Sequence, residues 1–225
     1  MARMGIEDLC ALGSRERGGN SRMSVPPGTL ADYVDRLSRR APEYLDLVSA
    51  QTEQEFENVF IGLLEKAVAG IEKNKGHFNG LDEEALTAVL VLAQTMPGLT
   101  VTQEAHSNGH VDLTIEADHC VPMRRKLGEA KIYNGPAYHL KGIGQLLGRD
   151  TTGREGRGFL VVYVKKPAIA DLIKNLRHKM DTDLPLKQRG ATQDHPMKWS
   201  FVSVHSHSCG EDLEIGHIGC NLHVE

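Results

Sequence analysis

Apolar residues recur along the chain at two different spacings, which predict a mixture of helices and strands. Leu30, Val34 and Leu37 share one helical face, so we expect a helix from about residue 30. Helical spacing continues over residues 52–71 and again over 81–95. The last of these segments is apolar on nearly all sides, which is typical of a deeply buried helix.

A spacing of two residues, typical of strands, dominates the middle of the chain. It predicts short strands at 99–105, 110–116 and 126–133, separated by turn-forming residues. A continuous apolar run at 159–164 predicts a central strand that is covered on both faces. The remaining elements that we expect are helices at 136–147 and 167–180 and strands at 199–204 and 213–218.

This order of elements predicts an α/β fold, an α/β/α sandwich around a mixed central sheet with an N-terminal helical extension. Residues 1–27 carry Gly, Pro and mixed charges without periodicity, which indicates a flexible leader. We assign residues 28–78 to the helical extension and 79–225 to the main domain. The helices of the extension could pack onto that domain or form a dimer contact.

Composition narrows the classes of protein that the chain can belong to. Its 225 residues, 40% of them hydrophobic, are enough for one substantial core. No apolar run approaches the length of a membrane span, so we expect a cytoplasmic protein that does not bind membranes, with its four cysteines reduced. The net charge is −4, but basic side chains outnumber acidic ones over residues 123–187. We therefore expect the C-terminal half to meet any polyanion.

Three polar residues on two of the predicted strands form a candidate catalytic group. Asp112 alternates with Val111 and Leu113, which places it on the face opposite the apolar one. Glu129 and Lys131 share a face by the same two-residue period. If the two strands are neighbours, all three residues converge.

Their chemistry suits the hydrolysis of a phosphodiester bond. Two carboxylates offer the hard oxygen ligands that Mg²⁺, or Mn²⁺ in its place, prefers. Asp112 and Glu129 are therefore candidate metal ligands, to which the carbonyl of Ala130 could add a third. Lys131 supplies a cation that can position the attacking water or offset the developing negative charge.

The segments Gly109-His110-Val111-Asp112-Leu113 and Gly128-Glu129-Ala130-Lys131-Ile132 resemble the core motif of the PD-(D/E)XK, restriction-endonuclease-like superfamily. The segment Gly144-Gln145-Leu146-Leu147-Gly148 is similar to the helix that follows this motif in many of these nucleases. The resemblance implies the restriction-endonuclease-like fold, dependence on Mg²⁺ and a catalytic Gln145. Tyr138 and Lys141 lie on the same side of that helix as Gln145 and are candidate nucleic-acid contacts.

The superfamily often adds an acidic residue from the helix before the motif. Glu83 and Glu84 both lie in the first turn of the predicted helix at 81–95, and we choose Glu84 as the catalytic candidate. Glu104, at the end of the preceding strand, is a further candidate metal ligand. Glu57 would require the more distant helix to take that role.

These residues predict a metal-dependent endonuclease or exonuclease that acts on DNA rather than RNA. The resemblance implies a role in restriction or anti-phage defence, and the cleavage of both strands of a duplex favours a homodimer. The alternative is a catalytically silent module of the same fold that binds nucleic acid or supports assembly. A third hypothesis, a zinc-stabilised C-terminal interaction domain, rests on His205, His207, Cys209, His217, Cys220 and His223 without the usual ligand spacing.

Two glycines in the predicted helix at 136–147 need an explanation of their own. Gly142 and Gly144 each destabilise a helix by about 1 kcal/mol relative to alanine. We interpret them as a sign that a backbone, a strand or a nucleic acid approaches this helix closely, with a helix kink as the alternative.

Overall fold

A computed structural model describes residues 26–106, 110–117, 119, 120, 122–150 and 156–225 of the chain. Side chains are described throughout these ranges except at residues 104–106, 110–112, 149 and 150. The described residues form a mixed α/β structure around one seven-stranded sheet with the strand order β1-β2-β3-β4-β7-β6-β5. The strands are β1 (Thr100–His106), β2 (His110–Ala117), β3 (Arg124–Ile132), β4 (Arg157–Val164), β5 (Gln193–Asp194), β6 (Ser200–Ser206) and β7 (Asp212–Asn221).

The sheet combines both strand directions. β3, β4 and β7 run parallel to one another, whereas the hairpin β1-β2 and the strands β5 and β6 join them in antiparallel fashion. Each of the two parallel pairs requires a crossover connection. These connections contain the helices α6 (Pro136–Gln145) and α7 (Ile169–Asp183).

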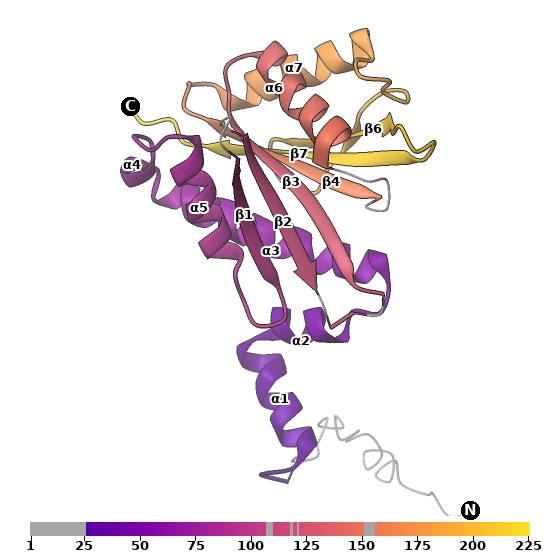
Figure 1. Ribbon diagram of the computed structural model, residues 1–225. Helices are drawn as coiled ribbons and strands as arrows, with labels where there is room; N and C mark the ends of the chain where they lie inside the picture. The colour runs from indigo at the N-terminus through magenta and orange to yellow at the C-terminus, as the bar shows by residue number, and fades with distance from the viewer. Residues whose placement is uncertain (1–25, 107–109, 118, 121, 151–155) are drawn as a thin grey trace, which may run out of the picture.

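Helices cover both faces of the sheet, as the sequence predicts for an α/β sandwich (Figure 1). On one face lie α3 (Glu53–Lys73) and α5 (Glu83–Gln94), whose apolar side chains join Leu113, Ile115 and Val161 in one core cluster. On the other face, α6 and α7 bury a second cluster around Leu160, Val162 and Ile215. The central strand β4 contributes to both clusters, because it is buried from Gly158 to Val164.

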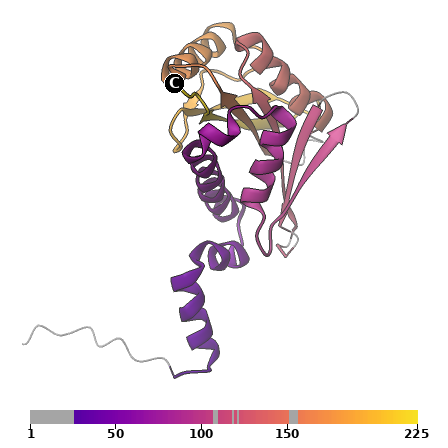
Figure 2. The same cartoon turned by 90° about the vertical axis from the view of Figure 1, so that its left-hand side faces the viewer.

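The N-terminal helices divide into two parts. α3 packs onto the main sheet, which is one of the two arrangements expected for it, and seven of its side chains are buried. By contrast, α1 (Leu30–Arg40) has no buried residue, and it projects from the rest of the chain beyond α2 (Pro42–Ser49) (Figures 1 and 2). Among the described residues, the structure contains no helix with the length and apolar character of a membrane span.

Several element boundaries differ from the sequence prediction for local reasons. The helix expected at 167–180 begins only at Ile169, because Ala168 adopts a left-handed backbone conformation with φ of 59°. The helix expected at 136–147 changes to a π-helical turn, η1 (Leu146–Asp150), after Gln145. α2, the short helix α4 (Lys75–Phe78) and β5 were not predicted. They are too short to show a clear period.

Candidate active site

The register of β1, β2 and β3 brings the candidate carboxylate positions into one row. Asp112 lies opposite Glu129 across the antiparallel pair β2-β3, and Glu104 lies opposite Asp112 across β1-β2. Residues that are directly opposite occupy the same face of a sheet, with Cβ atoms roughly 5 Å apart. The side chains of Glu104 and Asp112 lie outside the described ones, so only their backbone positions enter this row.

Neighbouring residues identify the face that carries the row. Leu113 on β2 and Ala130 on β3 belong to the core cluster under α3 and α5. Alternation therefore assigns Glu129 and Lys131 to the face covered by α6 and α7, together with Leu127 of the second cluster. This agrees with the prediction that Glu129 and Lys131 share a face.

Lys131 is held between two carboxylates. Its ammonium pairs with Glu129 and lies 3.2 Å from Oε1 of Glu83. The side chain of Lys131 is 3% exposed and that of Glu129 is 0% exposed. Burial by itself lowers the pKa of Lys131, but the two carboxylates outweigh it, so that the pKa lies above its ordinary value. Lys131 is therefore a cation at neutral pH and suited to offset negative charge rather than to accept a proton.

Of the two glutamates in the first turn of α5, Glu83 is the one that contacts Lys131. The carboxylate of Glu83 contacts Lys131 and also accepts a 2.8 Å hydrogen bond from the backbone N–H of Ile132. These contacts fix the first turn of α5 to the end of β3. Glu84 is exposed, and its backbone carbonyl accepts a hydrogen bond from the side chain of Gln103. Glu83 is therefore closer to the candidate group than Glu84, which stays a prediction for the catalytic role.

α6 covers Lys131 on the face of the sheet opposite to α5. At Gly142 an added Cβ would lie 3.3 Å from both Lys131 Cγ and Leu160 Cδ1, so the absence of a side chain allows the helix to approach β3 and β4 closely. This confirms the interpretation of Gly142 as a site of close approach. For Gly144 the nearest side-chain atom would be 3.9 Å away, an ordinary contact, and the structure gives no comparable reason.

The three candidate residues of α6 differ in exposure. Gln145 is buried, Tyr138 is half-buried and Lys141 is exposed. Tyr138 also lines a cavity of about 530 Å³ at the carboxyl end of β3 and β4. That cavity is lined by Glu83, Ile132, Tyr133, Asn134, Tyr138, Lys165 and Lys166. Glu83 therefore connects the Lys131 pair with a hollow that carries basic and aromatic side chains.

The donor atoms near Lys131 suit a hard divalent cation, but the described side chains do not form a complete site. Within the described part of the chain, no group of three His, Cys, Asp or Glu side chains is arranged to hold a metal ion. Glu129 supplies carboxylate oxygens, and the register adds two carboxylate residues beside it. The predicted ligand Ala130 is fully buried on β3, between Glu129 and Lys131.

Two of the C-terminal histidines, His205 and His217, belong to a hydrogen-bonded chain that also contains Ser203 and His139. Nδ1 of His205 lies 3.1 Å from the carbonyl oxygen of Leu186, and Nε2 of His205 lies 2.8 Å from Ser203 Oγ. Ser203 Oγ also lies 2.7 Å from Nε2 of His217, whose Nδ1 lies 2.9 Å from Nε2 of His139 on α6. A carbonyl oxygen can only accept, so His205 donates its Nδ1–H to Leu186 and its Nε2 accepts from the Ser203 hydroxyl. If all three rings are neutral, Ser203 Oγ then accepts from Nε2–H of His217, and Nδ1 of His217 accepts from Nε2–H of His139.

This chain ends at Nδ1 of His139, which is buried and has no hydrogen-bond partner among the described residues. Burial lowers the pKa of His139 to about 3. Burial, followed by the neighbouring histidines, also lowers the pKa of His217 well below its ordinary value. The zinc hypothesis therefore loses two of its candidate ligands to internal hydrogen bonds. His205 is fully buried as well.

Searches of protein-family models, curated proteins and solved structures find no match for this chain.

Proposed function

We propose that this chain is a metal-dependent nuclease that hydrolyses phosphodiester bonds, with DNA as the expected substrate. The observation that supports the proposal best is the strand register that sets Asp112 opposite Glu129. Lys131 follows Glu129 on the same face, and its ammonium pairs with the Glu129 carboxylate. Two carboxylate positions and one buried cation are the residue types that this reaction requires.

Each residue has a distinct part in this proposal. Asp112 and Glu129 hold Mg²⁺ or Mn²⁺, to which Glu104 and the carbonyl of Ala130 are further candidate ligands. When bound, the metal ion offsets charge on the phosphate and lowers the pKa of a coordinated water. Lys131 adds a fixed positive charge near the phosphate that is attacked.

In this proposal Glu83 positions the catalytic lysine, and Gln145 is a further catalytic candidate. Glu83 binds both the ammonium of Lys131 and the backbone of Ile132, so it fixes where the lysine lies along β3. Gln145 projects from α6, the helix that covers Lys131 and approaches it at Gly142.

The substrate would reach these residues along the cavity at the end of β3 and β4. Its walls carry Lys165, Lys166 and Tyr138, and the ammonium of Lys166 lies 6.0 Å from the ring centroid of Tyr133. Lysines bind phosphates and tyrosine rings stack on bases, which together suit a nucleic-acid strand. Lys141 is exposed on the neighbouring helix and extends this basic surface.

The cellular setting follows from the same proposal. A nuclease of this kind would act in the cytoplasm, in restriction or anti-phage defence. Cleavage of both strands of a duplex calls for two active sites and hence a homodimer. α1 exposes Leu30, Tyr33 and Val34, an apolar surface that a second copy of the chain could cover.

The test is cleavage of labelled DNA and RNA by the full chain in Mg²⁺, in Mn²⁺ and in EDTA. We expect metal-dependent cutting of DNA, reduced roughly 10²–10³-fold by Lys131→Ala, because one fixed charge-stabilising donor is lost. The matched control is Lys179→Ala, which removes an exposed lysine that pairs with Asp183 on α7. Glu83→Gln should lower the rate more than Glu84→Gln. Cutting that persists in EDTA, or that Lys131→Ala leaves unchanged, would refute the proposal.

A catalytically silent nucleic-acid-binding or assembly module is the second candidate. The almost complete burial of Glu129 and Lys131 favours it, because an enclosed ion pair can serve the fold alone. The same assay separates the two functions. Tight binding of DNA without cutting in either metal ion, with binding retained in Lys131→Ala, would indicate the module.

A further inference from the structure

A second cavity lies on the opposite face of the sheet, between α3 and the strands β3, β4 and β7. Its volume is about 270 Å³. Residues 193–196, which precede β6, close one side of it, and Arg157 and Gln54 lie on its wall. Pockets for drug-sized ligands measure roughly 300–1,000 Å³, so this cavity suits a smaller molecule.

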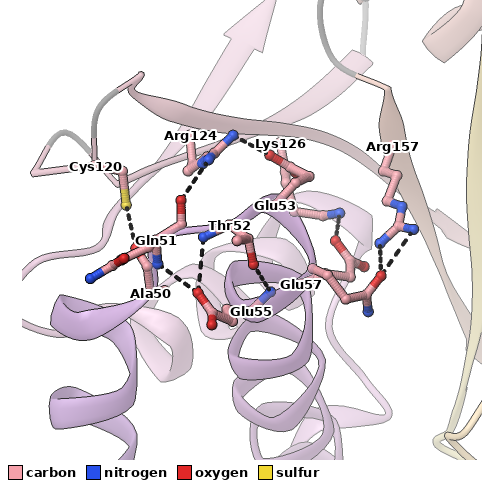
Figure 3. A network of polar contacts seen from close by, with 11 residues as sticks. Ala50, Gln51, Thr52, Glu53, Glu55, Glu57, Cys120, Arg124, Lys126 and Arg157 are labelled. Carbon is pink, nitrogen blue, oxygen red and sulfur yellow. Dashed lines mark hydrogen bonds and ion pairs between the residues drawn. The ribbon is translucent and has the colours of Figure 1, made fainter.

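An ion pair between Lys126 and Glu57 lies on the wall of this cavity (Figure 3). The side chain of Lys126 is 2% exposed and that of Glu57 is 12% exposed. Removing both charges from water costs several kcal/mol per ion, and apolar residues of similar size would often be at least as stable. The pair is therefore a poor choice for stability alone, and its position indicates a role in the cavity.

The pair leaves hydrogen-bonding capacity unused. An ammonium has three N–H groups, and the only hydrogen bond described for Lys126 goes to Oε2 of Glu57. Among the described residues, no hydrogen bond is made to Oε1 of Glu57. Neither Lys126 Nζ nor the Glu57 oxygens are among the fully buried polar atoms that lack a partner. Lys126 and Glu57 together thus present a donor and an acceptor side by side.

His195 provides a second donor on the same wall. Its Nδ1 accepts a 3.1 Å hydrogen bond from the backbone N–H of Met197, so the proton of the neutral ring is on Nε2. Burial lowers the pKa of His195, which keeps the ring neutral. Nε2 lies 3.8 Å from the place that a Cβ of residue 216 would take, and Gly216 lines the cavity.

The charges around the cavity are already balanced. Lys126 pairs with Glu57, Arg157 lies 3.4 Å from Glu214, and Asp194 is bound by Arg177 from outside the cavity. A charged ligand would have to break one of these pairs, whereas a neutral ligand need not.

Aromatic rings supply the remaining surface. Phe60 and Phe159 line the cavity with ring centroids 5.3 Å apart, and the Lys126 ammonium lies 5.0 Å from the Phe60 centroid. Leu64 and Ile218 complete this apolar part. A flat, apolar ring system with polar edges would match both parts of the wall.

We propose that this cavity binds a nucleobase, free or as a nucleoside, with its polar edge on Lys126, Glu57 and His195. A nucleobase is neutral and planar, and it carries acceptors and donors next to one another on one edge. The inference does not depend on the proposed nuclease function, because the cavity and the row of Asp112 and Glu129 lie on opposite faces of the sheet.

The experiment is a calorimetric titration of the full chain in EDTA with adenosine, guanosine, cytidine and uridine, each used separately. We expect one-to-one binding of at least one nucleoside. Gly216→Val should weaken it at least about tenfold, because the new side chain occupies the cavity. An alanine Cβ at this position meets no atom closer than 3.7 Å, so Gly216→Ala serves as a milder version that is expected to fold.

Two controls distinguish this cavity from other binding sites. Gly70→Ala adds a Cβ on α3 that meets nothing within 4 Å and should leave binding unchanged. Lys131→Ala should likewise leave nucleoside binding unchanged even if it abolishes DNA cleavage. The proposal is overturned if no nucleoside binds the folded chain at millimolar concentration. It is also overturned if folded Gly216→Val and Gly216→Ala both bind the nucleoside as strongly as the unmodified chain does.

Discussion

The buried histidines predict that acid destabilises the protein well above the range in which carboxylates titrate. In the folded protein His139 stays neutral down to a pKa of about 3, against an ordinary value of 6.5. As pH falls below about 6.5, the unfolded chain takes up a proton that the folded chain refuses, so the free energy of unfolding decreases. The stability is complete above the unfolded value and is lost progressively as pH falls toward the folded one.

The size of this effect follows from the two pKa values. Each such histidine lowers the free energy of unfolding by about 1.4 kcal/mol per pH unit, which for His139 gives about 2 kcal/mol at about pH 5. His217, whose pKa is also lowered by burial, acts in the same direction. A domain of ordinary stability has only about 5–15 kcal/mol in total. The loss is therefore large enough to measure by urea denaturation between about pH 8 and pH 5.

A matched pair of variants tests whether the pH dependence of stability comes from the buried, hydrogen-bonded histidines. His139→Gln keeps a neutral N–H donor for His217 and removes one titrating ring, so the slope should decrease by about 1.4 kcal/mol per pH unit. The control is His223→Gln, which changes a half-buried histidine that does not belong to this set of hydrogen-bonded residues; a slope that decreases as much as in His139→Gln would contradict the assignment. Constant stability between pH 8 and 5.5, or an equal slope in His139→Gln, would show that the reasoning is wrong.

Two further predictions concern packing. Lys126→Met alone should destabilise the fold by about 3–5 kcal/mol, because it leaves Glu57 buried without its partner, and adding Glu57→Leu should recover most of that loss. Chemical denaturation of both single variants and the double variant tests this, and a double variant whose loss equals the sum of the two single losses would contradict it. Gly128→Ala would place a methyl group 2.2 Å from the Phe159 ring and should destabilise the fold by about 1–3 kcal/mol or more, whereas Gly70→Ala in α3 should stabilise it slightly. Thermal unfolding compares the two variants, and equal melting temperatures would contradict the expected clash with Phe159.

Alternation along single strands was the most reliable guide that the sequence offered. The apolar positions of β2 and β3 predicted which residues face the core, and Leu113 and Ala130 lie there. The mixed α/β sandwich followed from the same patterns, whereas the restriction-endonuclease-like form of it stays a prediction. Pairing of Asp112 with Glu129 was expected from the convergence of the two strands and is present in the register.

Contacts between distant elements could not be predicted in this way. Glu83 and Glu84 are adjacent in the first turn of α5, and only the rotation of the helix against β3 decides that Glu83 reaches Lys131. Lys126 was grouped with the basic side chains that would meet a polyanion, yet it is buried. Its partner Glu57 precedes it by 69 residues, so no local pattern connects them.

Alternate side chains of β3 lie on opposite faces of the sheet. Lys126 and Gly128 belong to one side, and Glu129 and Lys131 belong to the other. Inserting or deleting one residue within this strand would turn every later position over. With an insertion between Gly128 and Glu129, Glu129 and Lys131 would together point toward the aromatic rings beneath α3, on the face that already holds the ion pair of Lys126 and Glu57. We therefore expect β3 to tolerate no change in its length.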